Sequence, residues 1–232
     1  MRNYNLLNIS IKHDFLYILF IIHYIKNNMK KPIEVFSEWA LNGKDKGMEK
    51  NHANPVEEML NFITKERNEI GNEFSFLDLG CGNGWVVRKM LKEKLCNKAV
   101  GIDGSINMIA NAKAFNDNCK YLTGDLEEIE LQQKFDVIHS MEVLYYIDKP
   151  AALLEKIAKF WLSENGRLIV GIDRYFENQE SHSWDTDVGT KMHLKSEYEW
   201  VEMFKAAGFK QVSSWRANVN DSWAGTLVIS AN

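Results

Sequence analysis

The stretch Phe76-Leu77-Asp78-Leu79-Gly80-Cys81-Gly82-Asn83-Gly84 decides the fold of this chain. An apolar run typical of a buried strand passes into a loop with a glycine at every second residue, and a helical pattern begins at Trp85. Glycines let a backbone approach a ligand closely, and the N–H groups at the start of the next helix face the same ligand. The stretch therefore predicts a nucleotide or nucleoside site after the first strand of an α/β unit.

Length and composition are those of one sizeable soluble domain. The chain has 232 residues, of which 45% are apolar and 26% charged, and its formal net charge is -4. Domains that bind nucleic acid usually carry a clear basic excess, so a large nucleic-acid partner is disfavoured. Cys81, Cys96 and Cys119 form no Cys-x-x-Cys pair, so neither a disulfide framework nor a metal site is expected. A reducing cytoplasm is the expected location.

The first 28 residues are expected to be an N-terminal extension of a domain that covers residues 29–232. Their apolar run, 15–22, is shorter than the ~20 residues that span a bilayer, and no small-residue cleavage site follows it. We therefore expect no membrane span and disfavour secretion. Two readings stay open: translation begins at Met29, or the extension is an arm that packs on the domain or on a partner.

Strand-like and helix-like patterns alternate along the rest of the chain. The expected strands are 74–79, 98–103, 120–123, 135–140, 167–172, 210–215 and 225–230. The expected helices are 33–41, 55–69 with Asn54 as its cap, 85–95, 105–115, 148–162 with Asp148 as its cap, and 196–208 with a capping box at Ser196 and Glu199. A mobile loop is expected around Gly43 and Gly47. Five strands with intervening helices predict a doubly wound parallel sheet, and the last two strands predict a hairpin with an antiparallel member.

The glycine loop lacks the features of a phosphate site. A dinucleotide fingerprint needs glycine at the sixth place counted from Gly80, and that place holds Trp85. No Lys-Ser/Thr pair follows, which excludes a P-loop. Asp103 ends the second strand, where a carboxylate can accept hydrogen bonds from both ribose hydroxyls, and Asp125 after the third strand can accept from the amine of a base. These positions favour a nucleoside without phosphate.

Four motifs in this order resemble those of the class I S-adenosylmethionine-dependent methyltransferases, and more narrowly the small-molecule enzymes of the group that includes quinone biosynthesis. They are Leu77-Asp78-Leu79-Gly80-Cys81-Gly82-Asn83-Gly84, Gly101-Ile102-Asp103-Gly104-Ser105, Gly124-Asp125-Leu126 and the run from Phe135 to Leu144. The resemblance covers roughly residues 74–172. It implies a Rossmann-like seven-stranded sheet in the order 3-2-1-4-5-7-6 with strand 7 antiparallel.

The resemblance also implies a set of contacts with S-adenosylmethionine. Gly80 and Gly82 would pass beneath the methionine part, and Asp78 would hold the loop or the amino group. Asp103 would bind the ribose, Asp125 and Leu126 the adenine edge, and Met108 the adenine face. Ser140 and Met141 would lie near the sulfonium. Cys81 and Gly104 complete the expected set, with no chemistry assigned to the Cys81 thiol.

Methyl transfer from a sulfonium needs alignment, plus a base where the acceptor must lose a proton. The candidate bases are His182, His193 and His52, with His182 preferred because it lies in a loop rich in aromatic residues that is expected to be a substrate lid. Glu142 and Tyr145, after the fourth strand, are further catalytic candidates, and a packing role is as plausible for each.

Two other functions stay open. One is a catalytically idle S-adenosylmethionine-binding module that acts through partners, and the other, disfavoured by Trp85, is an NAD-dependent oxidoreductase. The expected acceptor is a small molecule rather than a nucleic acid, because no Pro-Pro-aromatic element follows Met141. The sequence indicates neither the acceptor atom nor the oligomeric state.

Overall fold

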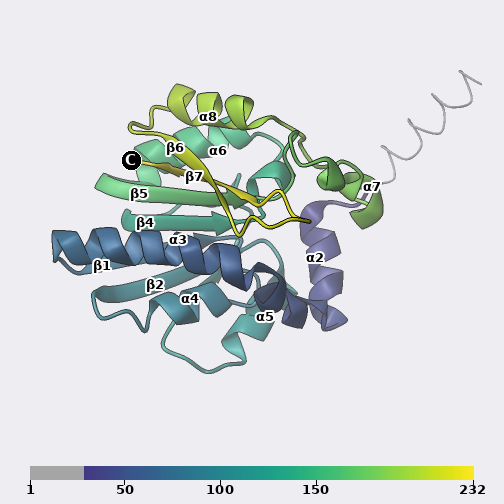
Figure 1. Ribbon diagram of the computed structural model, residues 1–232. Coiled ribbons are helices and arrows are strands. Elements are labelled where there is room, and N and C mark those ends of the chain that lie inside the picture. The colour runs from purple at the N-terminus through teal and green to yellow at the C-terminus, as the bar shows by residue number, and fades with distance from the viewer. Residues whose placement is uncertain (1–28) are drawn as a thin grey trace, which may run out of the picture.

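Seven strands form one sheet in residues 29–232, the part of the chain that the computed structural model describes (Figure 1). Their order is β3-β2-β1-β4-β5-β7-β6. Their bounds are β1 Phe74–Leu79, β2 Cys96–Asp103, β3 Lys120–Thr123, β4 Phe135–Met141, β5 Leu162–Ile172, β6 Ser213–Ala217 and β7 Thr226–Ala231. Strands β1 to β5 pair in parallel, whereas β7 is antiparallel to both β5 and β6. The predicted order and the predicted terminal hairpin are confirmed.

Helices cover both faces of the sheet. They are α2 Pro32–Leu41, α3 Met48–Ile70, α4 Trp85–Met90, α5 Ile106–Lys113, α6 Pro150–Lys156, α7 Trp184–Val188 and α8 Glu197–Ala206. Successive residues of β1 face opposite sides of the sheet: Phe76 belongs to the core cluster that includes residues of α3, α4 and α5, and Leu77 belongs to the cluster that includes residues of α6 and α8. Helices α2 and α7 lie together beyond the carboxyl ends of the parallel strands (Figure 1). Within the described residues, no helix has both the length and the apolarity needed to cross a membrane.

Several predicted helix boundaries are wrong, because burial of apolar side chains outweighs the local capping signals in the sequence. Asn54 does not cap a helix: α3 begins at Met48, and Pro55 lies buried inside it. Proline inside a helix removes one hydrogen bond at a cost of about 3 kcal/mol. In α3, a helix of 23 residues, the burial of Val56, Met59 and Ile63 offsets that cost. The segment 44–47, expected as part of a mobile loop, contains a short 3₁₀-helix.

Two further helix ends differ from expectation. Helix α6 is preceded by Lys149 without a side-chain cap, while the predicted cap, Asp148, accepts a hydrogen bond from Lys191 Nζ at 3.1 Å. The expected helix 85–95 ends at Met90. By contrast, the capping box of Ser196 and Glu199 is confirmed, as is the cap at Ser105, whose Oγ accepts from Met108 N at 3.1 Å. The predicted extension, residues 1–28, lies outside the described residues.

Candidate active site

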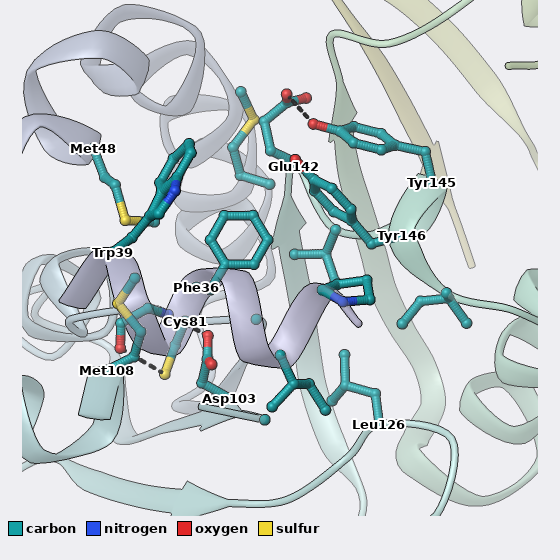
Figure 2. Close-up of a pocket in the computed structure, with 18 of the residues that line it drawn as sticks. Phe36, Trp39, Met48, Cys81, Asp103, Met108, Leu126, Glu142, Tyr145 and Tyr146 are labelled. Carbon is teal, nitrogen blue, oxygen red and sulfur yellow. Dashed lines mark hydrogen bonds between the residues drawn. The ribbon is translucent and has the colours of Figure 1, made fainter. Parts of the chain in front are cut away.

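A cavity of about 600 Å³ opens at the carboxyl ends of the parallel strands, where ligands of open α/β sheets bind. One end is formed by the loop after β1 and by the ends of β2 and β3. The other end is formed by the residues after β4 and by parts of α2, α3 and α7, while Ile33 of α2 and Met48 of α3 also reach the first end. Figure 2 shows this division, with Asp103 and Met108 on one side of Phe36 and with Glu142 and Tyr145 on the other. We call the two parts the cofactor half and the acceptor half.

The loop after β1 takes a conformation that few residues other than glycine adopt. Gly80, Gly82 and Gly84 have φ values of 72°, 53° and 79°. A Cβ on Gly80 would lie 2.2 Å from Cγ2 of Val143, so the loop and the segment after β4 approach too closely for any side chain. The alternating glycines therefore give the cofactor half a wall that consists of backbone atoms.

Asp78 is held in place by a histidine that the sequence analysis missed. Nδ1 of His139, on β4, lies 2.7 Å from Oδ1 of Asp78, and both side chains are buried. The His139 Nε2 atom has no hydrogen-bond partner within the described residues, and both residues line the cavity. This pair leaves polar groups available to a ligand beneath the glycine loop.

Asp103 supports the loop and also faces the cavity. Its carboxylate accepts hydrogen bonds from Gly82 N at 2.9 Å and from Ser105 N at 2.8 Å. Burial raises its pKa to about 6, although both hydrogen bonds act in the opposite direction. A ligand that donates hydrogen bonds to the ionised carboxylate would offset that cost of burial.

Most of the other predicted cofactor contacts also line the cavity. Gly104, Met108, Asp125, Leu126 and Met141 do so, as does Cys81. Burial, followed by the charges of Asp103 and Asp78, raises the pKa of the Cys81 thiol well above its usual range, which fits a packing role. Ser140 is not among the lining residues: its Oγ donates to Leu79 O at 2.9 Å and joins β4 to β1.

Glu142 is the central polar group of the acceptor half. Its backbone has φ 60°, which is unusual for a residue with a side chain, and its Oε2 accepts a hydrogen bond from Tyr145 Oη at 2.5 Å (Figure 2). The Oε1 atom accepts from the backbone N of Asp173, also at 2.5 Å. Burial first, and then the nearby charge of Asp173, raises the pKa of Glu142 well above its usual range. Backbone strain and a partly buried carboxylate at one position are typical of functional sites.

Aromatic residues cover the acceptor half from two directions. Phe36 and Trp39 come from α2. The rings of Phe36 and Tyr146 pack edge to face, with their centroids 5.1 Å apart. Trp184 comes from α7, in the segment predicted to be a lid. The two covers are joined, because Thr190 Oγ1 donates to Lys30 O at 2.8 Å.

The three candidate histidines have different surroundings. His182 does not line the cavity: its ring lies beside Phe176, and its Nε2 is 2.8 Å from Phe176 O. His193 also lies outside the cavity lining, with its Nε2 3.3 Å from Asp148 O. His52, on α3, does line the cavity, and one of its ring nitrogens lies within 4.8 Å of carboxylate oxygens of Glu142 and Asp173.

Sequence reasoning missed the residues that reach the cavity from unrelated segments. These are Phe36, Met48 and His139, together with Asp173, which does not line the cavity but lies beside Glu142, which does. Phe36 and Met48 lie in no motif, and His139 lies within the fourth motif without having been given a role there. Asp173 directly follows a buried strand, a position that could have indicated it.

S-adenosylmethionine fits the chemistry of the cofactor half. A side chain at Gly80 would occupy the space next to the loop, which the glycine leaves free. Asp103 and Asp125 can accept hydrogen bonds from hydroxyl and amine groups, and Met108 offers an apolar surface. Within the described residues, no arginine lines the cavity, and arginine is the residue best suited to bind a phosphate group.

Comparison with known proteins gives the family. Residues 21–214 match the family model described as "Methyltransferase domain". A malonyl-[acyl-carrier protein] O-methyltransferase from Halalkalibacterium halodurans is 28% identical over 134 residues, which cover 53% of this chain and 49% of that protein. A tRNA U34 carboxymethyltransferase from Alteromonas mediterranea is 32% identical over 104 residues, 40% of this chain and 31% of that protein. The chain spans about half the length of the curated relatives it matches.

Solved structures agree with the sequence comparison. A chain of the complex between the Haloferax volcanii Trm112 methyltransferase activator and a methyltransferase superposes with a TM-score of 0.73 at 27% identity, over 84% of this chain and 96% of that chain. Other structures with this fold hold S-adenosylmethionine or S-adenosylhomocysteine. The chain therefore belongs to the class I S-adenosylmethionine-dependent methyltransferases.

Proposed function

We propose that this methyltransferase acts on a small molecule that enters the acceptor half of the cavity. The observation that carries the proposal is the extent of the cavity, which continues past the cofactor half to a space between Phe36, Tyr146 and Trp184. Aromatic walls with few polar groups are typical of small-molecule sites. A nucleic-acid substrate is disfavoured, because the basic residues at this cavity, Lys31 and Lys191, are outnumbered by acidic ones.

The cofactor half supports a specific set of contacts. In this proposal the backbone at Gly80 and Gly82 lies beneath the methionine part of the cofactor, and Asp78, fixed by His139, takes its amino group. Asp103 accepts from the ribose hydroxyls, and Asp125 accepts from the adenine amine. Leu126 and Met108 pack against the adenine ring. Their positions on the cavity wall support this proposal.

Alignment is the main task left to the protein, because the cofactor supplies a methyl group already activated by positive sulfur. Orientation of bound reactants can supply ~7–11 kcal/mol of a reaction barrier. We assign Glu142 to the polar hydrogen of the acceptor and Tyr145 to holding Glu142, since their hydrogen bond fixes the carboxylate beside the aromatic walls. His182 is not assigned a role, because it lies outside the cavity lining.

A labelled methyl group tests the proposal. The purified chain is incubated with S-adenosylmethionine labelled in the methyl group, together with either a metabolite extract or total RNA, and Asp103→Ala serves as the control variant. We expect label in the small-molecule fraction and none in RNA. Label in RNA would contradict the choice of acceptor. Cofactor binding without label above the Asp103→Ala control would favour the idle binding module.

A further inference from the structure

Three side chains from distant parts of the sequence meet at the acceptor half, and two of them line the cavity. His52 lies on α3, Glu142 directly follows β4, and Asp173 directly follows β5. One ligand atom from each of them lies within 4.8 Å of the others. The parallel strands β4 and β5 are neighbours, so their carboxyl ends bring the two carboxylates together, and α3 adds the imidazole.

Each of the three side chains is oriented by a hydrogen bond to a residue outside the cluster. Nδ1 of His52 lies 3.0 Å from Met48 O, which leaves Nε2 with a free lone pair. Oδ1 of Asp173 accepts from Thr226 Oγ1 at 2.5 Å, and Oε2 of Glu142 accepts from Tyr145 Oη. Metal-binding histidines and carboxylates are typically held by outer contacts of this kind.

The two carboxyl groups of the cluster have no lysine or arginine partner among the described residues. No lysine or arginine forms a salt bridge with Glu142 or Asp173, and the adjacent Arg174 is paired with Asp185. Asp173 is only 6% exposed, and no hydrogen bond to its Oδ2 is found in residues 29–232. Two neighbouring carboxylates in such a position favour the binding of a cation.

We propose that His52, Glu142 and Asp173 bind a divalent transition-metal ion. One imidazole nitrogen and two carboxylate oxygens suit ions from Mn²⁺ to Zn²⁺ better than Mg²⁺ or Ca²⁺, which prefer oxygen ligands alone. The long spacing of the three residues in sequence explains why no metal motif is visible.

Three protein ligands leave a coordination position free, and His52 and Glu142 both line the cavity. An acceptor oxygen or nitrogen bound at that position would be oriented by the ion, and the pKa of its proton would fall. This use of the ion rests on the proposed function, whereas binding of the ion does not.

Calorimetry on the full chain tests the proposal without any acceptor. The protein is treated with a chelator, which is then removed, and it is titrated with MnCl₂, ZnCl₂ and, for comparison, MgCl₂. We expect one Mn²⁺ or Zn²⁺ per chain and weaker binding of Mg²⁺. Asp173→Asn and His52→Gln should each lower the affinity for Zn²⁺ at least tenfold, since ligands matter no less than outer contacts, which typically contribute 10–100-fold.

His193→Gln and Asp221→Asn are matched controls, because they remove the same chemical groups outside the cluster. Binding of S-adenosylhomocysteine reports whether each variant is folded, and Glu142→Gln replaces any variant that is not. The proposal would be overturned if the wild-type protein bound neither Mn²⁺ nor Zn²⁺ in the titration. Equal affinity for Zn²⁺ in the cluster variants and the control variants would also overturn it. The methyl-transfer assay is separate, so failure of the ion site leaves the proposed function standing.

Discussion

The cofactor half and the acceptor half of the cavity differ in how the sequence encodes them. Most of the cofactor half comes from three short motifs at the carboxyl ends of β1, β2 and β3, within residues 78–126. The acceptor half combines α2, α3 and α7 with the segment after β4, across more than half of the chain. The shape of the cofactor half depends mainly on backbone conformation, and the shape of the acceptor half depends mainly on side-chain packing. The two halves should therefore respond differently to substitution.

The largest effect is expected from Gly80→Ala, which breaks the backbone wall of the cofactor half. Its φ of 72° disfavours any Cβ, and the added atom would lie 2.2 Å from Val143. Gly43→Ala is the matched control, because Gly43 has φ 69° and no atom within 4 Å of such a Cβ. Backbone strain should cost about 1–2 kcal/mol in both variants, and overpacking about 1–3 kcal/mol more in Gly80→Ala. Urea unfolding measures the difference, and equal losses would show that the approach of Val143 imposes no constraint.

A pH titration of cofactor binding sharpens the comparison, since it isolates Asp103. Its pKa is raised to about 6 by burial, and the ionised form accepts the ribose hydrogen bonds in our assignment. Binding then favours the deprotonated carboxyl, so affinity should be level well above pH 6 and fall below it by up to about tenfold per pH unit. Calorimetry with S-adenosylhomocysteine between pH 5 and pH 8 measures this change. The same decrease in Asp103→Asn would assign it to another group.

The smallest effect is expected at the contact between the two covers of the acceptor half. Thr190→Val removes the hydrogen bond to Lys30 O, a loss of about 1 kcal/mol. Amide hydrogen exchange in residues 184–190 should become about fivefold faster, with cofactor affinity unchanged. Ser183→Ala, which removes a hydrogen bond within the same segment, is the control. Protection unchanged in Thr190→Val would mean that the contact does not hold α7 in place.

The difference between the halves also explains what the sequence predicts. The alternation of strands and helices, the glycine loop and Asp103 are predictable from local periodicity or from a residue at the end of a strand. The strand order is implied only by the resemblance to a known family. The start of α3 is not predictable from Asn54 and Pro55, since burial of an apolar face outweighs a capping signal. The pairing of His139 with Asp78 and the approach of Asp173 to Glu142 depend on tertiary contacts, which no local pattern predicts. His182 carried a pattern typical of a lid, yet its side chain lies beside Phe176.

Binding of S-adenosylhomocysteine to Asp103→Asn and Glu142→Gln tests the central claim most directly, namely that the cofactor half binds its ligand independently of the acceptor half. Both variants replace one partly buried carboxylate by an amide of the same shape. Asp103→Asn should weaken binding by about 1.5–3 kcal/mol, or roughly 10–150-fold, because charge-assisted hydrogen bonds to the ribose are lost. Glu142→Gln should stay within about twofold of the wild-type affinity, a negligible free-energy change. Equal losses in the two variants, or unchanged affinity in Asp103→Asn, would contradict the division of the cavity.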